Sequence, residues 1–369
     1  MTSEKKIAIE RAIIKPTNAC NLDCTYCGAW RDVNGRMSMD TLENIYRSLS
    51  QTIGKGSVSI YWHGGEPLMV GLDFYKTAIE LQKQFSPTVF KNLMVTNLTL
   101  CNDKWAAFFS ENDFIIGTSI DGPANIHDKY RQRFNGRGSF QKVIDSLAIL
   151  RKHNVNISGA IATLHKGNIN HVVQIYQTYS DLRLNLTLGY MYPGGLKACK
   201  ELTISDNEYY TALKLLFDAW LSDQNPVEVD LFEIIISAII NPGQVRSCLN
   251  DLVGFNVDGK IFPCHAMIGD PIFELSEISY GYDLSCPNKK WSKIRRMTDD
   301  LNEYCQKCEV FGICNGLCPY VNSILWNNPV YTGQDCTYAK DFYIWAKARL
   351  MPYLEEYKNN SEIDKYMEV

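Results

Sequence analysis

Residues 15–27 read Lys15-Pro-Thr-Asn-Ala-Cys20-Asn-Leu-Asp-Cys24-Thr-Tyr-Cys27 and directly follow the apolar pair Ile13-Ile14. The C-x3-C-x2-C spacing is too tight for a disulfide framework. It also provides one thiolate fewer than a closed iron–sulfur cluster or a structural zinc site takes from the protein. Three thiolates can hold three corners of a [4Fe–4S] cube and leave the fourth iron open to another ligand. The stretch therefore predicts a reactive iron–sulfur site that follows a first β-strand.

This cysteine loop resembles that of the radical S-adenosylmethionine (SAM) enzymes. In that family the amino and carboxylate groups of SAM chelate the open iron, and an electron from the cluster cleaves SAM to methionine and a 5′-deoxyadenosyl radical. Short motifs match by chance, and an incidental cysteine cluster or a partial zinc site is the alternative. The resemblance implies that Cys20, Cys24 and Cys27 hold a [4Fe–4S] cluster.

A second cysteine pattern lies in the C-terminal part of the chain. It comprises Cys248, Cys264 at the end of Gly259-Lys-Ile-Phe-Pro-Cys264, and then Cys305, Cys308, Cys314, Cys318 and Cys336. This order and spacing resemble the SPASM extension of radical SAM enzymes that modify peptides and proteins, in which seven cysteines hold two auxiliary [4Fe–4S] clusters. A zinc site built from the four closely spaced cysteines has the right ligand type, but it leaves Cys248, Cys264 and Cys336 without a role.

The resemblance also implies how these cysteines divide between the auxiliary clusters. Cys305, Cys308, Cys314 and Cys336 should hold the outer cluster, and Cys248, Cys264 and Cys318 the inner one. The inner set has only three thiolates. Its fourth iron is open, bound by Cys286 or another side chain, or reserved for a cysteine of the substrate, and the sequence leaves these alternatives open.

Composition supports metal ligation over disulfide bonding. The 369 residues are 46% hydrophobic and 21% charged, with a net charge of −4, which gives no electrostatic footprint for nucleic acid or an anionic membrane. No apolar stretch reaches the length of a membrane span, and the polar start is not a secretory signal. We therefore expect a cytoplasmic protein whose 13 cysteines are reduced or metal-bound. Buried structural thiols are expected at the three positions outside the motifs: Cys101, Cys199 and Cys286.

Short β-branched runs alternate with amphipathic stretches from residue 7 to about residue 190. The predicted strands are Ile7–Ile14, Val58–Trp62, Leu93–Thr96, Phe114–Ser119, Val155–Ala162 and Leu182–Met191. The predicted helices are Met39–Ile53, Leu72–Phe85, Lys104–Glu111, Ser139–His153 and Ile169–Tyr179, and Asp40 with Glu43 resembles a capping box at the start of the first. This alternation predicts parallel strands, and six such units match the open (β/α)6 barrel of radical SAM enzymes.

The pattern changes after this region. Helices are predicted at Asn207–Asp223 and Val229–Ile240. A hairpin is predicted with its turn at Asp258-Gly259, and a last helix at Tyr338–Tyr357 is expected to be broken at Pro352. We therefore predict an α/β fold: a partial (β/α)6 radical SAM barrel with its linker helix over 1–225, and a loop-rich SPASM iron–sulfur domain over 226–369.

Polar residues that follow the predicted strands resemble the SAM-binding positions of the family. Gly64-Gly65-Glu66-Pro67 resembles the GGEP motif, whose backbone and glutamate take the SAM amino group. Asn97, Ser119 and Asp121 match the next polar positions, at the ribose and carboxylate. Arg131 resembles an arginine that pairs with the SAM carboxylate, and Tyr26 occupies the aromatic position whose backbone lies near adenine. A polar residue at a strand end that merely caps the next helix is the simpler alternative for each.

His265 directly follows Cys264, in a stretch similar to the P-C-H-x3-G of peptide maturases. Anaerobic sulfatase-maturing enzymes have an aspartate after the corresponding cysteine, and it is their proposed base. A histidine here can accept a substrate proton, or it can be a hydrogen-bond donor beside the cluster. His265 is therefore the candidate catalytic residue, and the departure from aspartate lowers the expectation of sulfatase maturation.

Three functional hypotheses follow. The leading one is a radical SAM/SPASM oxidoreductase that uses SAM and three [4Fe–4S] clusters to form a C–S or C–C cross-link in a ribosomally made peptide. The alternative is anaerobic sulfatase maturation, in which Cys or Ser becomes formylglycine, and the alternative of another class is a non-catalytic iron–sulfur or zinc scaffold. The resemblance implies a peptide or protein substrate and a flavodoxin- or ferredoxin-type electron donor. Because the first strand begins within ten residues, leader recognition for a precursor peptide is expected from a separate leader-binding protein or from the SPASM region.

Overall fold

The computed structural model describes residues 9–27, 35–191, 200–241, 249, 251–286, 288–294, 305–314 and 336–359. A mixed sheet runs through the molecule in the order β6-β5-β4-β3-β2-β1-β7-β8-β9. Its strands are β1 (Arg11–Ile14), β2 (Ser57–Trp62), β3 (Val89–Val95), β4 (Ile115–Ser119), β5 (Asn156–Leu164), β6 (Leu186–Tyr190), β7 (Leu252–Phe255), β8 (Lys260–Phe262) and β9 (Ser276–Glu277). The six predicted strands are all present, and neighbours from β1 to β6 pair in parallel. The predicted α/β fold of six parallel strands is therefore confirmed.

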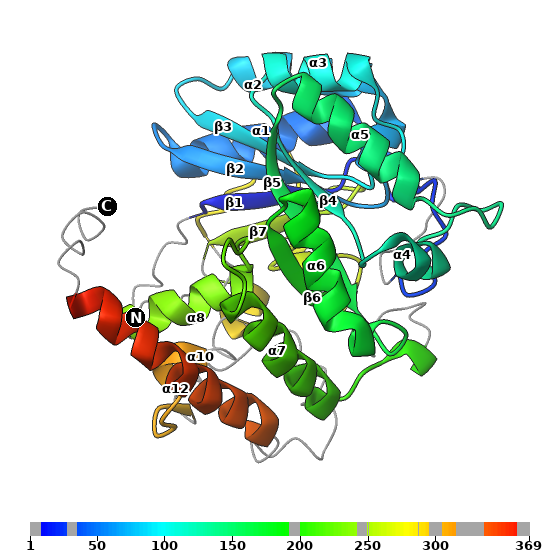
Figure 1. Ribbon diagram of the computed structural model, residues 1–369. Coiled ribbons are helices and arrows are strands. Elements are labelled where there is room, and N and C mark those ends of the chain that lie inside the picture. Colours follow the sequence, from blue (N-terminus) through cyan, green and yellow to red (C-terminus); the bar gives the residue numbers. More distant parts are fainter. Residues whose placement is uncertain are drawn as a thin grey trace.

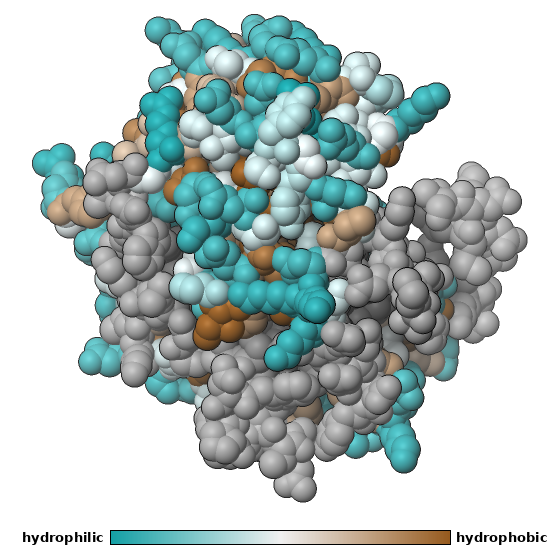
Figure 2. Space-filling view, turned by 180° about the vertical axis from the view of Figure 1, so that it is seen from behind, coloured by the Kyte–Doolittle hydropathy of each residue, from teal (hydrophilic) through white to brown (hydrophobic). Residues whose placement is uncertain are grey.

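Helices follow the strands along the chain. They are α1 (Met39–Ile53), α2 (Leu72–Lys83), α3 (Asp103–Glu111), α4 (Ala124–Tyr130), α5 (Phe140–Lys152), α6 (Val172–Leu182), α7 (Asp206–Leu221), α8 (Asp230–Ile240), α10 (Phe311–Cys314) and α12 (Thr337–Asn359). In Figure 1, α2, α3 and α5 lie above the strands, whereas α7, α8, α10 and α12 lie below them. Hydrophilic side chains cover much of the upper part of the molecule when it is seen from behind (Figure 2). The sheet is thus shielded by helices whose outer faces meet water.

Large aromatic side chains fill the space between the first strands and their helices. Trp62, Tyr75 and Phe114 are each no more than 1% exposed, and the rings of Trp62 and Tyr75 meet edge to face. Because β2 alternates buried and partly exposed positions, Val58, Ile60 and Trp62 face this core. The resulting core holds the carboxyl ends of β1 to β5, where the polar motifs begin.

Two local predictions about helix geometry are wrong. Ser38, not Asp40, caps α1, because its hydroxyl accepts a hydrogen bond from the backbone N–H of Thr41 at 3.0 Å. Pro352 lies inside α12 and does not end it. The packing of α12 against α7 and α8 stabilises a continuous helix although proline removes one backbone hydrogen bond.

The predicted hairpin extends the barrel sheet. Strands β7 and β8 pair antiparallel around Asp258-Gly259, where Gly259 has a φ of 82°, and β7 pairs in parallel with β1. The pairing of β7 with β1 is supported by an ion pair between Arg11 and Asp251 at 2.6 Å. As a result, the segment that carries Cys264 and His265 lies beside the carboxyl end of β1. None of the helices in the described ranges is long and apolar enough to cross a membrane.

Candidate functional site

The cysteine loop is attached to the rest of the fold on both sides. On one side, the backbone N–H groups of Gly65 and Glu66 donate to the carbonyl oxygens of Thr17 and Ala19 at 3.0 and 2.7 Å. On the other, the N–H of Thr25 donates to the carbonyl of Tyr130 at 3.0 Å. Cys24 is buried, and Cys20 and Cys27 are partly buried. The fold therefore positions the loop against both the GGEP segment and the end of α4.

The two glycines of the GGEP motif are required by this close approach. Gly64 has a φ of 140°, and a Cβ there would lie 2.5 Å from the carbonyl oxygen of Thr17. A Cβ on Gly65 would overlap the carbonyl oxygen of Ala19. Glycine lets the two loops touch through their backbones.

Gly65→Ala should therefore displace the cysteine loop. We expect the iron content of the N-terminal cluster to fall and SAM affinity to weaken ~10-fold or more, since displaced backbone readily costs ~1.4 kcal/mol. Iron analysis and equilibrium SAM binding measure both effects. Gly117→Ala is the matched control, because its added Cβ finds its nearest neighbour at 3.4 Å. Wild-type iron and SAM binding in Gly65→Ala would contradict this account of the loop.

Glu66 joins two segments through a fully buried carboxylate. It accepts hydrogen bonds from the backbone N–H of Leu68 at 3.0 Å and of Asn97 at 2.7 Å, and from the hydroxyl of Thr96 at 2.6 Å. Burial raises the pKa of Glu66, and these hydrogen bonds act in the opposite direction. Glu66 thus holds the end of β2 against the end of β3. Its contact with the SAM amino group remains a prediction.

Asn97 orients the cysteine loop from the end of β3. Its amide nitrogen donates to the side-chain oxygen of Asn21 at 2.9 Å and approaches the sulfur of Cys20 at 3.9 Å. Its side-chain oxygen accepts hydrogen bonds from the backbone and hydroxyl of Thr99. Ser119, another predicted SAM position, is the partly buried last residue of β4.

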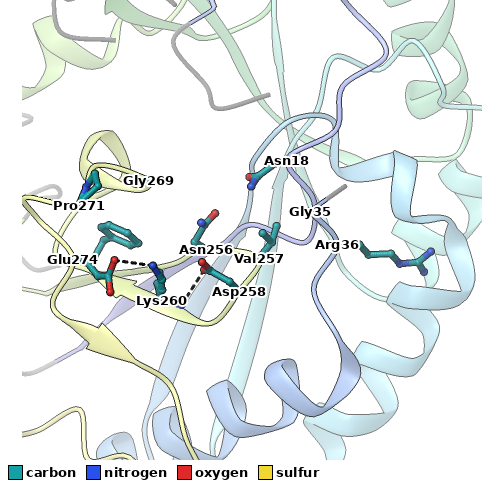
Figure 3. A pocket seen from close by; sticks show the side chains of 11 residues that line it. Asn18, Gly35, Arg36, Asn256, Val257, Asp258, Lys260, Gly269, Pro271 and Glu274 are labelled. Atoms are coloured by element: carbon teal, nitrogen blue, oxygen red, sulfur yellow. Dashed lines mark hydrogen bonds and ion pairs between the residues drawn. The ribbon is translucent and has the colours of Figure 1, made fainter. Parts of the chain in front are cut away.

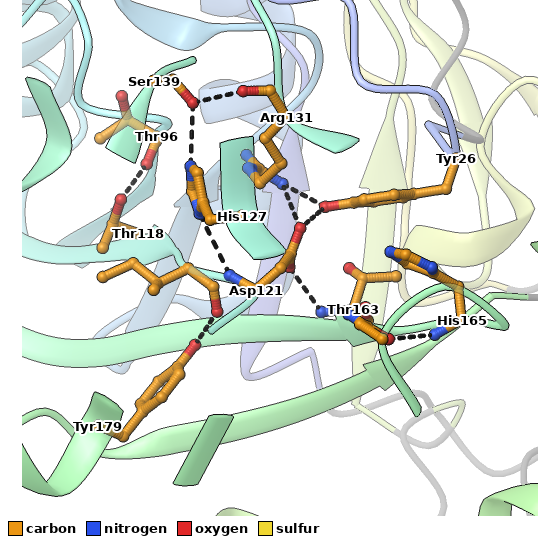
Figure 4. Close-up of polar contacts among 12 residues, drawn as sticks. Tyr26, Thr96, Thr118, Asp121, His127, Arg131, Ser139, Thr163, His165 and Tyr179 are labelled. Atoms are coloured by element: carbon orange, nitrogen blue, oxygen red, sulfur yellow. Dashed lines mark hydrogen bonds and ion pairs between the residues drawn. The ribbon is translucent and has the colours of Figure 1, made fainter. Parts of the chain in front are cut away.

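Tyr26, Asp121 and Arg131 come together from three separate segments (Figure 4). The Tyr26 hydroxyl donates to Asp121 Oδ2, and Arg131 Nη1 donates to the Tyr26 oxygen at 2.7 Å and lies 4.0 Å from Asp121 Oδ2. Burial raises the pKa of Asp121, whereas Arg131 and the Tyr26 hydroxyl act to lower it. Nε of Arg131 is buried without a hydrogen-bond partner. Arg131 therefore already pairs with a carboxylate of the protein, and its predicted pairing with SAM rests on its remaining nitrogens.

Sequence reasoning missed the residues that hold the side chains of Tyr26, Asp121 and Arg131 in place. His127 Nδ1 accepts a hydrogen bond from the backbone of Asp121 at 3.3 Å, so Nε2 carries the proton and donates to Ser139 at 2.9 Å. The Ser139 hydroxyl in turn donates to the carbonyl of Arg131 at 2.7 Å. A single histidine and a single serine match no motif, and only the fold shows their connection.

His63 and His265 form a second feature that the motifs did not predict. The distance from His265 Nε2 to His63 Nδ1 is 3.2 Å, and the ring centroids are 4.2 Å apart. Burial lowers the pKa of His265 to about 4, with the charge of Lys15 adding to the effect. Burial also lowers the pKa of His63 well below its usual value, and the charges of His265 and Lys15 contribute. The His265 residue nevertheless remains exposed to solvent. A ring surrounded by protein yet accessible to water lies in a concave region, beside the GGEP loop.

A separate cavity of about 450 Å³ opens beside the cysteine loop. It is lined by Asn18, by Arg36, and by the hairpin and the segment after it, where Lys260 and Glu274 form an ion pair at 3.0 Å (Figure 3). None of the predicted site residues lines it. It is therefore distinct from the region around Tyr26, Glu66 and His265.

The C-terminal cysteines are partly described. Cys264 follows β8 and is buried. Burial raises the pKa of Cys305, and the nearby Cys336 and Cys308 contribute to this rise. Cys314 ends α10. Cys248 and Cys318 lie outside the described residues. The outer cysteine set is thus brought together in part by the fold, although these residues are up to 31 positions apart in the chain.

The donor set at the N-terminal loop suits an iron–sulfur cluster. Burial raises the pKa of Cys20 to about 12, and the nearby Cys24 and Cys27 contribute. Within the described ranges, no three histidine, cysteine or acidic side chains meet at a spacing suited to a single metal ion. A cube does not require such a spacing, because each cysteine binds a different iron. The three thiols of this loop, whose backbone is hydrogen-bonded to the fold on both sides, fit that arrangement.

Comparisons with known proteins agree with this geometry. A model of the radical SAM superfamily matches residues 14–179. The chain is 28% identical to a cysteine-type anaerobic sulfatase-maturating enzyme of Clostridium novyi, covering 83% of this chain and 87% of that protein. It is also 28% identical to a serine-type enzyme of Bacteroides thetaiotaomicron, covering 83% and 82%. The solved structure of native anSMEcpe with bound AdoMet (SAM) and Cp18Cys peptide is 26% identical, with a TM-score of 0.80 over 95% of this chain and 99% of that one.

Proposed function

The chain is a radical SAM enzyme closely related to the anaerobic sulfatase-maturating enzymes, and on this premise we propose that it oxidises a cysteine or serine side chain of a protein or peptide to formylglycine. One observation carries the proposal: the similarity to maturases extends over more than four fifths of both chains, beyond the radical SAM domain alone. The comparisons thus support the alternative of the sequence analysis better than its leading hypothesis of a peptide cross-link.

The reaction removes a hydrogen atom, an electron and a proton from the substrate side chain. From serine this gives the aldehyde directly, and from cysteine it gives a thioaldehyde that water hydrolyses to the aldehyde with release of hydrogen sulfide. Cys20, Cys24 and Cys27 would hold the cluster at which SAM binds, and SAM would supply there the radical that takes the hydrogen atom. We assign the substrate's electron to auxiliary clusters that the C-terminal cysteines would hold, which would make three [4Fe–4S] clusters in all. The electron that SAM cleavage consumes is assigned to a flavodoxin- or ferredoxin-type donor. Thiolate-bound clusters of this kind need a reducing compartment such as the cytoplasm.

His265 is the proposed acceptor of the proton. The Nδ1 atom of His63 accepts a hydrogen bond from the backbone N–H of Gly64 at 2.7 Å, so it carries no proton itself. The hydrogen between the two rings must then lie on His265 Nε2, which leaves His265 Nδ1 free to accept a proton. His265 therefore offers a neutral ring with a lone pair directly after Cys264.

The direct test is an aldehyde assay on defined peptides. Anaerobically reconstituted protein is incubated with SAM, a reductant and a sulfatase-derived peptide that carries cysteine, serine or alanine at the modified position. We expect an aldehyde, detected by hydrazide tagging and mass spectrometry, on the cysteine or serine peptide and none on the alanine peptide. SAM cleavage with either peptide but no aldehyde would refute formylglycine formation. Loss of two hydrogens without an aldehyde would instead support the cross-linking hypothesis.

The Cys305→Ala/Cys308→Ala double variant tests the auxiliary clusters. We expect it to lose about four of ~12 irons, and its C-terminal region to become sensitive to protease, because the free energy of metal binding there is also folding free energy. Cys101→Ala is the control, since this buried thiol lies outside both motifs. One equivalent of zinc and no auxiliary iron in protein prepared without oxygen would favour the zinc alternative.

A further inference from the structure

A closed turn beside the cysteine loop carries an exposed aromatic side chain. It spans residues 132–138 and is called the outer turn below. An antiparallel bridge joins Gln132 to Gly138, and the backbone N–H of Arg133 donates to the carbonyl of Arg137 at 2.8 Å. Phe134, at the tip, is 68% exposed. Aromatic side chains are enriched where proteins bind one another, so Phe134 is a candidate contact residue.

The outer turn is bonded directly to the segment that carries Cys24. Leu22 forms an antiparallel bridge with Arg133, and the backbone N–H of Asp23 donates to the carbonyl of Gln132 at 2.7 Å. In Figure 1 the cysteine loop, drawn in dark blue, lies beside α4, the helix that leads into the outer turn. The GGEP segment is bonded to the other side of the loop. The outer turn is therefore a surface from which a partner reaches the cysteine loop without passing the GGEP segment.

The charged side chains on and beside the outer turn are mostly basic. Lys129 and Arg137 are exposed and Arg133 is partly buried. None of the three forms an ion pair within the ranges that the structure describes. Of the nearby carboxylates, Asp23 is exposed, and Asp128 accepts hydrogen bonds from two backbone N–H groups at the start of α5. On a chain with a net charge of −4, this basic area favours a partner with an acidic face.

We propose that the outer turn, together with Lys129, is the docking surface for an acidic one-electron donor protein. The donor is oxidised by one electron, and the cluster predicted at the cysteine loop is reduced by one, which is the electron that SAM cleavage consumes. Electron transfer requires the two redox centres to come close, and the outer turn is one backbone hydrogen bond away from the segment with Cys24. This inference rests on the radical SAM part of the proposed function and not on formylglycine formation, so the two can fail separately.

The test compares two sources of the electron for SAM cleavage. Anaerobically reconstituted protein receives SAM and either flavodoxin, kept reduced by its NADPH-dependent reductase, or titanium(III) citrate, a small reductant that needs no docking surface. The rate of 5′-deoxyadenosine formation is measured against flavodoxin concentration at low and high salt. The variants are Phe134→Ala and the double charge reversal Lys129→Glu/Arg137→Glu. The matched controls are Leu215→Ala, on the exposed face of α7, and Lys55→Glu, in the exposed turn before β2.

With flavodoxin at low salt, both outer-turn variants should lower kcat/KM for the donor ~10-fold, because each removes a main contact of the docking surface. With titanium(III) citrate they should stay within ~2-fold of the wild type, as surface substitutions usually do, and both controls should match the wild type with either reductant. High salt should weaken the effect of the charge reversal more than that of Phe134→Ala, because salt screens exposed charges.

Three results would overturn the proposal. Equal losses with both reductants would show that the outer turn acts on the cysteine loop itself. Unchanged flavodoxin kinetics in both variants would place the donor elsewhere, and a higher KM for the peptide in those variants would assign the surface to the substrate. Ferredoxin replaces flavodoxin if the wild type does not respond to flavodoxin, and a wild type that accepts electrons from titanium(III) citrate but from neither protein also contradicts the proposal.

Discussion

Replacing Cys20, Cys24 and Cys27 together with alanine should abolish SAM cleavage and remove about four irons, while the auxiliary clusters remain. The three thiolates are the only ligands that the loop offers to the cluster, and the open iron is the atom that SAM chelates in this family. Activity should fall below detection because the resemblance assigns the electron that cleaves SAM to the cluster of these three cysteines. The measurements are 5′-deoxyadenosine formation by chromatography and iron per chain.

The control for this variant is Cys101→Ala, which removes one buried thiol outside the motifs and should keep both iron and SAM cleavage. Continued 5′-deoxyadenosine formation by the triple variant would disprove the assignment of the reactive cluster to these cysteines.

His265→Ala should lower product formation ~10²-fold or more, the usual effect of deleting a general base, while iron content and SAM cleavage are retained. The ring is accessible, is held by His63 at 3.2 Å, and directly follows Cys264. Its loss should therefore affect the proton-removal step after hydrogen abstraction. Aldehyde product, 5′-deoxyadenosine and iron are measured on the same preparation.

The matched control is His171→Ala, a histidine at the surface that interacts with Gln174. Two results would contradict the base assignment in different ways. Loss of iron together with activity would show that His265 supports the cluster, and full product with intact clusters would leave the proton acceptor to be found elsewhere.

Local patterns predicted the regular elements well where the period was clear. The helix Met39–Ile53 has the predicted bounds, and β2 differs from its prediction by one residue. Strand β1 is shorter than the predicted Ile7–Ile14, and the helix Ala124–Tyr130 was not predicted because its seven residues are too short for a clear period. Pro352 was expected to break the last helix on local chemistry alone, and tertiary packing prevailed.

The site was predicted as a set of residues but not as an arrangement. Cysteines and glycines at fixed spacing indicate their own chemistry, because a cluster needs thiolates and a close backbone approach needs glycine. The connection of Tyr26 to Arg131, 105 positions apart, has no local signal. The same holds for His127 and Ser139, which act through neighbours that only the fold brings together.

By itself, the sequence predicted the cysteine ligands of a reactive cluster, the order of six strand–helix units and the resemblance to the radical SAM enzymes, since each depends on residue type and short-range spacing. Tertiary structure alone decided that β7 pairs with β1 and that His63 meets His265 across 202 positions. These features depend on strand order and on contacts between side chains that are far apart in the chain. Both follow from the packing of the whole sheet, and no local stretch of the chain encodes them.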